Sequence, residues 1–152
     1  MRRPFARSIL IAASLAFAGS VLAAETARPE FLNTKESLQR GLPFSEAVRA
    51  GDLIFLAGQI GDKDGKVVPG GIGPEARQAM QHIKDVLERN GSSLRDVVKC
   101  TVFLADIADW PAFNEVYREF FKQPFPARSA LAASGLAMNA RVEVECIAYQ
   151  PK

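Results

Sequence analysis

The segment Arg141-Val-Glu-Val-Glu-Cys-Ile-Ala-Tyr149 decides the fold, because its apolar and polar residues alternate. Alternation with a period of two is typical of a β-strand that has one buried face. One face carries Val142, Val144, Cys146 and Ala148, and the other carries Arg141, Glu143, Glu145 and Ile147. We expect the apolar set to meet helices. The other face is too polar for a core, so we expect it to lie in a subunit interface or to line a cleft.

Four more strands are predicted upstream of this segment. Apolar and β-branched runs place them over 47–50, 53–58, 97–104 and 128–133. A Gly51-Asp52 turn joins the first two into a hairpin. The run over 53–58 is almost continuously apolar, so we expect both faces of that strand to be buried.

Two helices are predicted between the strands, over 74–90 and 109–121. The aromatic side chains of the second helix are expected to pack in the core. The glycine-rich segment 62–73 is interpreted as a plain loop, because no phosphate-binding motif surrounds it. The order β-β-α-β-α-β-β predicts an α+β domain, a mixed β-sheet with two helices packed on one face.

The first 23 residues have the pattern of a secretory signal peptide. They carry Arg2, Arg3 and Arg7 and no acid, and an apolar stretch ends with small residues at Val21 and Ala23. We predict cleavage after Ala23 and a periplasmic or secreted protein, the alternative being an uncleaved membrane anchor. Residues 24–40 are predicted to form a loose N-terminal arm before a domain over 41–152.

Composition argues against several classes of function. The 152 residues suit one domain, and without the leader 16 basic residues face 17 acidic ones, a net charge of −1. A scattered, slightly acidic chain does not favour nucleic acid as a partner. His82 is the only histidine. We expect it to be solvated on a helix surface, which leaves no base for a Ser or Cys triad and no zinc site.

The two cysteines, Cys100 and Cys146, lie in two predicted strands among apolar residues. Export to an oxidising compartment would allow a disulfide, but the distance between the two Cα atoms cannot be read from sequence. We expect two buried free thiols, with a disulfide as the alternative.

Arg128 and Glu143 are the strongest candidates for chemistry. Arg128 follows the rigid Phe125-Pro126 pair, and its planar guanidinium suits a small carboxylate. Glu143 could take a proton from water. From spacing alone, a structural ion pair of Glu143 with Arg128 or Arg141 is the preferred interpretation, and a binding site is the alternative.

At these residues the chain resembles the RidA (YjgF/YER057c/UK114) family of reactive-intermediate deaminases. The matching segments are 51–60, 76–78, 98–104, 113–117, 125–129 and 142–145. They extend over almost all of the chain after the leader.

The resemblance implies a chorismate-mutase-like (YjgF-like) fold and a homotrimer whose sheets meet at the centre, with three clefts between subunits. It also implies hydrolysis of imines and enamines, such as 2-iminobutyrate and 2-aminoacrylate, to 2-keto acids and ammonia. No cofactor or metal is implied. By resemblance, Arg128 holds the substrate carboxylate and Glu143 positions the attacking water, while Gly58 and Asn114 shape the cleft.

Three expected substrate-site positions depart from the common family pattern. Phe44 stands where many members have Tyr, Ala57 replaces a frequent Ser, and Ala130 occupies a site that is often Cys. Because Arg128 and Glu143 are kept, periplasmic imine hydrolysis is the main hypothesis. The alternatives are a non-catalytic trimer that binds 2-keto acids or acts as a holdase-like chaperone, and the endoribonuclease activity sometimes ascribed to the family.

Overall fold

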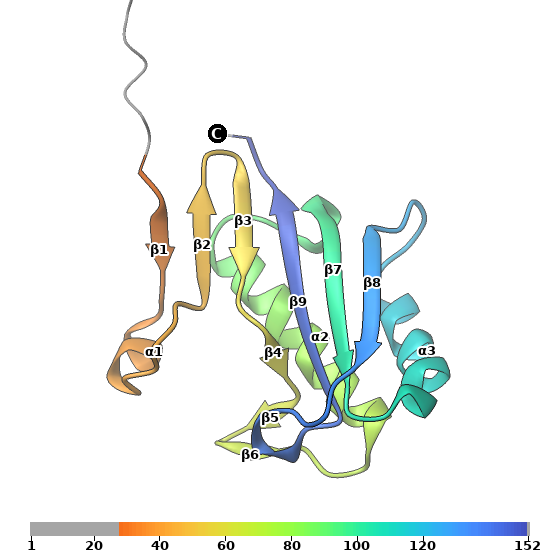
Figure 1. The fold of residues 1–152 in the computed structure, drawn as a ribbon. Helices are drawn as coiled ribbons and strands as arrows, with labels where there is room; N and C mark the ends of the chain where they lie inside the picture. The colour runs from red at the N-terminus through yellow and green to blue at the C-terminus, as the bar shows by residue number, and fades with distance from the viewer. Residues whose placement is uncertain (1–27, 152) are drawn as a thin grey trace, which may run out of the picture.

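The computed structural model describes residues 28–151, so the predicted signal peptide and the first residues of the arm lie outside the described residues. Residues 28–151 contain three helices, α1 (Lys35–Gln39), α2 (Ile72–Arg89) and α3 (Trp110–Phe120). Single 3-10 turns are η1 (Leu94–Asp96), η2 (Ile107–Asp109) and η3 (Ala137–Asn139). The main sheet contains β1 (Glu30–Leu32), β2 (Ala47–Ala50), β3 (Leu53–Leu56), β4 (Gln59–Ile60), β7 (Val97–Leu104), β8 (Ala127–Ala132) and β9 (Val142–Tyr149), and a separate hairpin contains β5 (Asp62–Lys63) and β6 (Lys66–Val67) (Figure 1).

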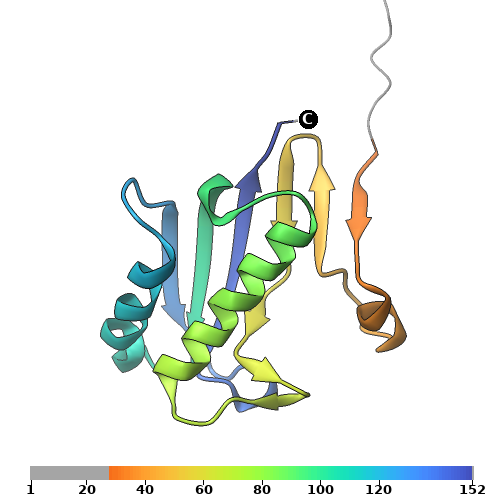
Figure 2. The ribbon, with the colours of Figure 1, turned by 180° about the vertical axis from the view of Figure 1, so that it is seen from behind.

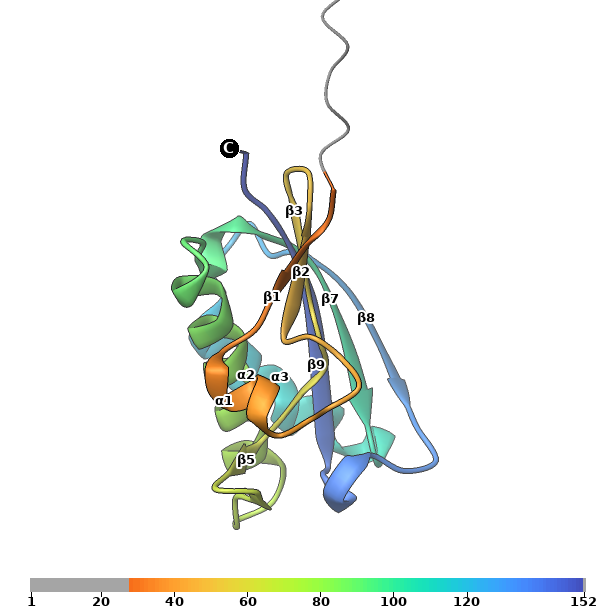
Figure 3. The ribbon, with the colours of Figure 1, turned by 90° about the vertical axis from the view of Figure 1, so that its left-hand side faces the viewer.

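The sheet is mixed, as the sequence predicted. Its strand order is β1-β2-β3-β9-β7-β8. Strand β4 also pairs with β9, along the same edge of β9 as β3. Only β7 and β8 run parallel among the described strand pairs. Helix α2 crosses the back of the sheet (Figure 2), and α3 lies on the same side of it (Figure 3). The prediction of two helices on one face is therefore confirmed.

The core lies between α2 and the central strands. The four predicted apolar residues of β9 are buried, and they meet Ala76, Met80, Ile83 and Leu87 of α2. Helix α2 begins at Ile72, two residues earlier than predicted, after Gly71 adopts a φ of 81° that L-residues rarely take. The segment 62–73, which was predicted to be a plain loop, thus contains the β5–β6 hairpin and the start of α2.

Strand β3 corrects the expectation that both its faces are buried. Ile54 and Leu56 are buried, but Phe55 remains 41% exposed on the face away from the helices. The helices cover only one face of the sheet, so a continuously apolar strand leaves alternate side chains uncovered. Across the uncovered face the strand register aligns Phe31, Val48, Phe55 and Ile147 in one apolar row.

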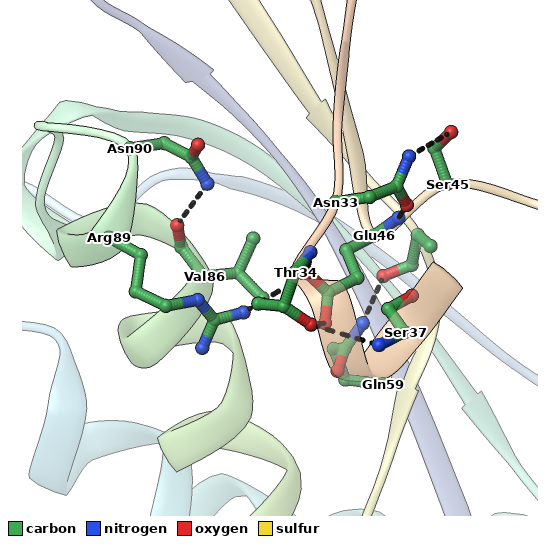
Figure 4. A network of polar contacts seen from close by, with 10 residues as sticks. Asn33, Thr34, Ser37, Ser45, Glu46, Gln59, Val86, Arg89 and Asn90 are labelled. Atoms are coloured by element: carbon green, nitrogen blue, oxygen red, sulfur yellow. Dashed lines mark hydrogen bonds and ion pairs between the residues drawn. The ribbon is translucent and has the colours of Figure 1, made fainter. Parts of the chain in front are cut away.

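The described part of the N-terminal arm is ordered by β1 and α1, and this differs from the loose arm that we expected. Strand β1 pairs with β2, and Thr34 caps α1 by accepting a hydrogen bond from the Ser37 amide. Glu46 fastens the arm, since its Oε2 accepts from the Thr34 amide at 2.9 Å and lies 3.4 Å from Arg89 of α2 (Figure 4). Elements this short carry no periodicity that a sequence reading can detect.

Cys100 and Cys146 form a disulfide, so the preferred expectation of two free thiols is wrong. They lie opposite each other in the antiparallel β7–β9 ladder, with their Cα atoms 4.1 Å apart. Both are buried in the core. The bridge therefore joins the two central strands beneath the helices. Among residues 28–151, no helix has the length and apolar character needed to cross a membrane.

Candidate active site

Arg128 sits in an aromatic cage that α3 supplies. Its Cζ lies 4.6 Å from the ring centroid of Tyr117, 5.1 Å from that of Trp110 and 5.8 Å from that of Phe113. Its Nη2 donates a 2.7 Å hydrogen bond to Asn114 Oδ1. The ring faces attract the cation and the amide orients it, so the guanidinium is held in place without a neutralising charge.

The Arg128 guanidinium has no carboxylate partner among the described residues. Its one side-chain hydrogen bond there is to a neutral amide, which leaves further N–H donors for a ligand. A cavity of about 260 Å³ opens beside it, lined by Asn114, Tyr117, Arg118, Phe125, Pro126 and Arg128. A half-buried cation with free donors at a cavity is suited to bind a small carboxylate. We call this region the arginine half-site.

Glu143 lies on β9, opposite Phe103 of β7 and Ile60 of β4. Burial raises the pKa of its carboxyl above the ordinary value, and the neighbouring carboxylate of Glu145 raises it further. Among the described residues, no side chain donates a hydrogen bond to it or forms an ion pair with it. A carboxylate whose pKa is raised and whose oxygens are free is suited to take a proton from water.

Gly58 gives the Glu143 carboxyl its space. A Cβ built on Gly58 would overlap Glu143 Oε1, so any larger residue would displace the carboxyl. The adjoining cavity has a volume of about 440 Å³, and we call it the glutamate half-site. Its lining includes Arg40, Leu42, Phe44, Gly58, Met138 and Glu143.

The Arg128 and Glu143 side chains project from opposite faces of the sheet. Arg128 pairs with Cys100 in the β7–β8 ladder, so its side chain shares the helix-covered face with that buried cysteine. Glu143 pairs with Phe103, an odd number of residues along β7 from Cys100, and therefore faces the uncovered side. The structure thus separates the two predicted catalytic residues within one chain.

The predicted ion pair of Glu143 with an arginine is wrong. Arg141 makes a two-pronged contact with Asp109, with Nε–Oδ2 and Nη2–Oδ1 distances of 2.9 Å each. Arg128 bonds Asn114 instead. Both arginines therefore contact other residues and not Glu143. The alternative from the sequence, that Arg128 and Glu143 belong to a binding site, agrees with these contacts.

The remaining predicted substrate-site residues divide between the two half-sites. Phe44 and Gly58 line the glutamate half-site, and Asn114 lines the arginine half-site. Ala57 and Ala130 are half-buried and line neither cavity, and Ala130 packs against the core. Sequence reasoning assigned the α3 aromatics to core packing and missed the cage. The feature of the sequence that could have indicated the cage was Arg128, which was predicted to begin the strand after this aromatic helix.

His82 corrects the expectation of a solvated surface side chain. It is half-buried, with Nδ1 3.1 Å from the carbonyl oxygen of Ile60 and Nε2 2.8 Å from the Gln78 amide nitrogen. The contact with Ile60 joins α2 to β4, and the contact with Gln78 lies within α2. Among the described residues, no cluster of three or more His, Cys, Asp or Glu side chains could hold a metal ion.

Comparisons with known proteins agree on one family. The family model described as Endoribonuclease L-PSP matches residues 34–150. A 2-iminobutanoate/2-iminopropanoate deaminase of Dermatophagoides farinae is 45% identical over 107 residues, covering 69% of this chain and 84% of the relative. The crystal structure of yeast YEO7 has 44% identity and a TM-score of 0.70, covering 72% of this chain and 88% of the other.

A second solved structure is similar over more of the chain. Mycobacterium tuberculosis Rv2704, described as a member of the YjgF/YER057c/UK114 family, has 28% identity and a TM-score of 0.68. The match covers 80% of this chain and 99% of that one. The sheet with its helices is therefore the YjgF-like fold that the sequence predicted. The chain belongs to the RidA (YjgF/YER057c/UK114) family, which the Endoribonuclease L-PSP model describes.

Proposed function

We propose that the protein hydrolyses imines and enamines of 2-amino acids to 2-keto acids and ammonia. The observation that carries this proposal is the Arg128 guanidinium, held on three aromatic rings with free donors and with no acidic partner among the described residues. Such a site selects a carboxylate. The deaminase from Dermatophagoides farinae supports the choice of reaction through its name and 45% identity.

The reaction requires only binding, orientation and one proton acceptor. Arg128 holds the substrate carboxylate, which places C2 and its C=N bond in the cleft. Glu143 takes a proton from water as the water oxygen attacks C2, and it passes this proton to the imine nitrogen, which gives a tetrahedral amino alcohol. A second proton then moves from the hydroxyl oxygen through Glu143 to the nitrogen, the C–N bond breaks, and ammonia leaves as the ketone forms. An enamine enters the same path after it tautomerises to the imine.

We further propose that the two half-sites combine across subunits of a homotrimer. The side chains of Arg128 and Glu143 project from opposite faces of one sheet. A site that contains both residues would therefore need a second copy of the chain. The uncovered sheet face carries the row of Phe31, Val48, Phe55 and Ile147, and burying this row would favour association. A trimer with sheets toward its centre would cover that face and place clefts between neighbours.

The test is an assay of 2-keto acid release from 2-iminobutyrate generated in the cuvette. We expect the wild type to accelerate release and Arg128→Ala to abolish the acceleration, while Arg95→Ala, an exposed control, retains it. If wild type and Arg128→Ala behave alike across several imino acids, the catalytic proposal fails. A wild type that binds 2-oxobutyrate without turnover would instead support the alternative of a non-catalytic binding trimer.

We also propose export, with cleavage after Ala23. The basic leader with its apolar stretch supports this proposal, and so does the buried Cys100–Cys146 disulfide, since stable disulfides are typical of oxidising compartments. Expression of the full chain in a bacterium, followed by fractionation and N-terminal sequencing, tests it. We expect the periplasmic species to begin at Ala24. Retention of Met1 on a cytoplasmic species would contradict export.

A further inference from the structure

The Tyr117 hydroxyl is a buried group without a partner. Tyr117 lies on α3 and is only 4% exposed. Its oxygen is the one buried side-chain polar atom among the described residues that has no hydrogen-bond partner. Buried tyrosine hydroxyls nearly always find a partner, and an unpartnered one calls for an explanation.

The surroundings of Tyr117 place it in the arginine half-site. It lines the same cavity as Arg128 and Asn114, and its ring centroid lies 4.6 Å from Arg128 Cζ. The neighbouring rings of Phe113 and Phe121, with centroids 5.7 Å and 4.7 Å away, hold the ring in place and offer the hydroxyl no acceptor. A ligand in the cavity is the simplest source of one.

The hydroxyl is able to donate a proton in a hydrogen bond throughout the physiological range. Burial raises the pKa of Tyr117 to about 12, although the positive charge of Arg128 acts in the opposite direction. A protonated phenol beside a guanidinium matches an anion, because both groups then offer donors. A cationic or purely apolar ligand would leave one of them without a partner.

We propose that the Tyr117 hydroxyl donates a hydrogen bond to the substrate carboxylate held by Arg128, which makes Tyr117 a substrate-binding residue of this enzyme. This inference rests on the proposed function, and it adds a residue that orients the carboxylate. Two donors from different elements, α3 and β8, fix the plane of the carboxylate. They thereby fix the direction in which C2 faces the attacking water.

The test compares Tyr117→Phe with Tyr149→Phe, which removes the hydroxyl of the other tyrosine in the chain, half-exposed at the end of β9. Binding of 2-oxobutyrate is measured by calorimetry, and KM and kcat are measured with 2-iminobutyrate. We expect Tyr117→Phe to raise both Kd and KM roughly tenfold, as for loss of a hydrogen bond to a charged group, with a smaller change in kcat. Tyr149→Phe should match the wild type.

Thermal unfolding separates this role from simple packing. Phe keeps the ring on Arg128 and removes only an unpartnered hydroxyl, so the Tm of Tyr117→Phe should equal or exceed that of the wild type. A binding constant like that of the wild type, with normal turnover in both proteins, would overturn the inference and leave the proposed function intact. A wild type that neither binds 2-oxobutyrate nor turns over imines would overturn both.

Discussion

The surroundings of Glu143 disfavour the ionised form of its carboxyl. Its carboxyl is half-buried on β9, and Glu145 projects from the same face two residues later. Both conditions disfavour the ionised form that a base must have. The residue therefore keeps its proton to a higher pH than an ordinary glutamate, and in the proposed mechanism this would favour return of that proton to nitrogen after the attack.

A pH profile reports this balance. Activity should rise with pH as Glu143 loses its proton, so the acid limb marks its pKa. Glu145→Gln removes one cause of the raised pKa, so we expect the acid limb of kcat/KM to move to lower pH. Glu88→Gln, on the exposed surface of α2, should leave the limb in place. An acid limb that does not move in Glu145→Gln would show that another group controls it.

Gly58 sets the position of the same carboxyl. In Gly58→Ala, the new Cβ would overlap Glu143 Oε1, so we expect kcat to fall at least tenfold, about the effect of a misplaced catalytic group. Gly73→Ala is the matched control, because a Cβ there meets nothing within 4 Å and the residue is helical. The Kd for 2-oxobutyrate should change little in either variant, since the arginine half-site is untouched. Unchanged turnover in Gly58→Ala would contradict the role of Glu143.

Strands β7 and β9 connect these residues to the rest of the fold. Strand β7 pairs with β8, which carries Arg128, and β9 carries Glu143. The Cys100–Cys146 disulfide joins the two strands at their centre. Each half-site is thus attached to one side of a single cross-linked strand pair, and movement of one strand relative to the other would disturb both.

Removing the cross-link should reduce stability. The disulfide closes a loop of 46 residues, and a loop of that length is expected to contribute about 2–4 kcal/mol, mainly by restricting the unfolded chain. We expect the double variant Cys100→Ala/Cys146→Ala to unfold at a lower temperature and denaturant concentration than the wild type. Chymotrypsin sensitivity at 37 °C gives an independent readout. Equal stability would contradict a stabilising role of the cross-link.

Pattern length decided which elements the sequence could predict. The runs that became β7, β9 and α2 extend over eight residues or more, enough to show their period. Strands β1, β4, β5 and β6 have two or three residues each, so their pairing depends on tertiary contacts alone. The disulfide was equally hidden, because strand register places the two cysteines opposite each other. The aromatic cage of Arg128 could not be predicted either, because it depends on how α3 packs against β8.

The proposed association of copies would bring together the two residues that one chain holds apart. The sequence and the family resemblance predicted that Arg128 and Glu143 belong to one site. The strand register, however, places their side chains on opposite faces of the sheet. The proposed trimer resolves this separation, since the arginine half-site of one copy can meet the glutamate half-site of the next. Each cleft would then contain residues from two subunits.

Mixed trimers test the shared cleft directly. Arg128→Ala and Glu143→Gln should each be inactive alone. Co-expressed in equal amounts, they should recover about a quarter of wild-type activity, because random assembly pairs an intact Arg128 with an intact Glu143 at one cleft in four. Two separately purified variants mixed without subunit exchange provide the control. No recovery in trimers shown by mass spectrometry to be mixed would place both residues of each site in one chain.

The aromatic cage also determines how the protein responds to its medium. A guanidinium that rests on rings carries a charge that no acid of the described residues neutralises, so in the absence of substrate any small anion can settle there. If Arg128 holds the substrate carboxylate as proposed, chloride, acetate and formate should compete with the substrate. We expect the apparent KM for 2-iminobutyrate to rise with acetate concentration while kcat stays constant, measured at fixed ionic strength. The anions of the buffer would then act as weak inhibitors. Kinetic constants for different substrates should therefore be compared at the same anion and the same anion concentration.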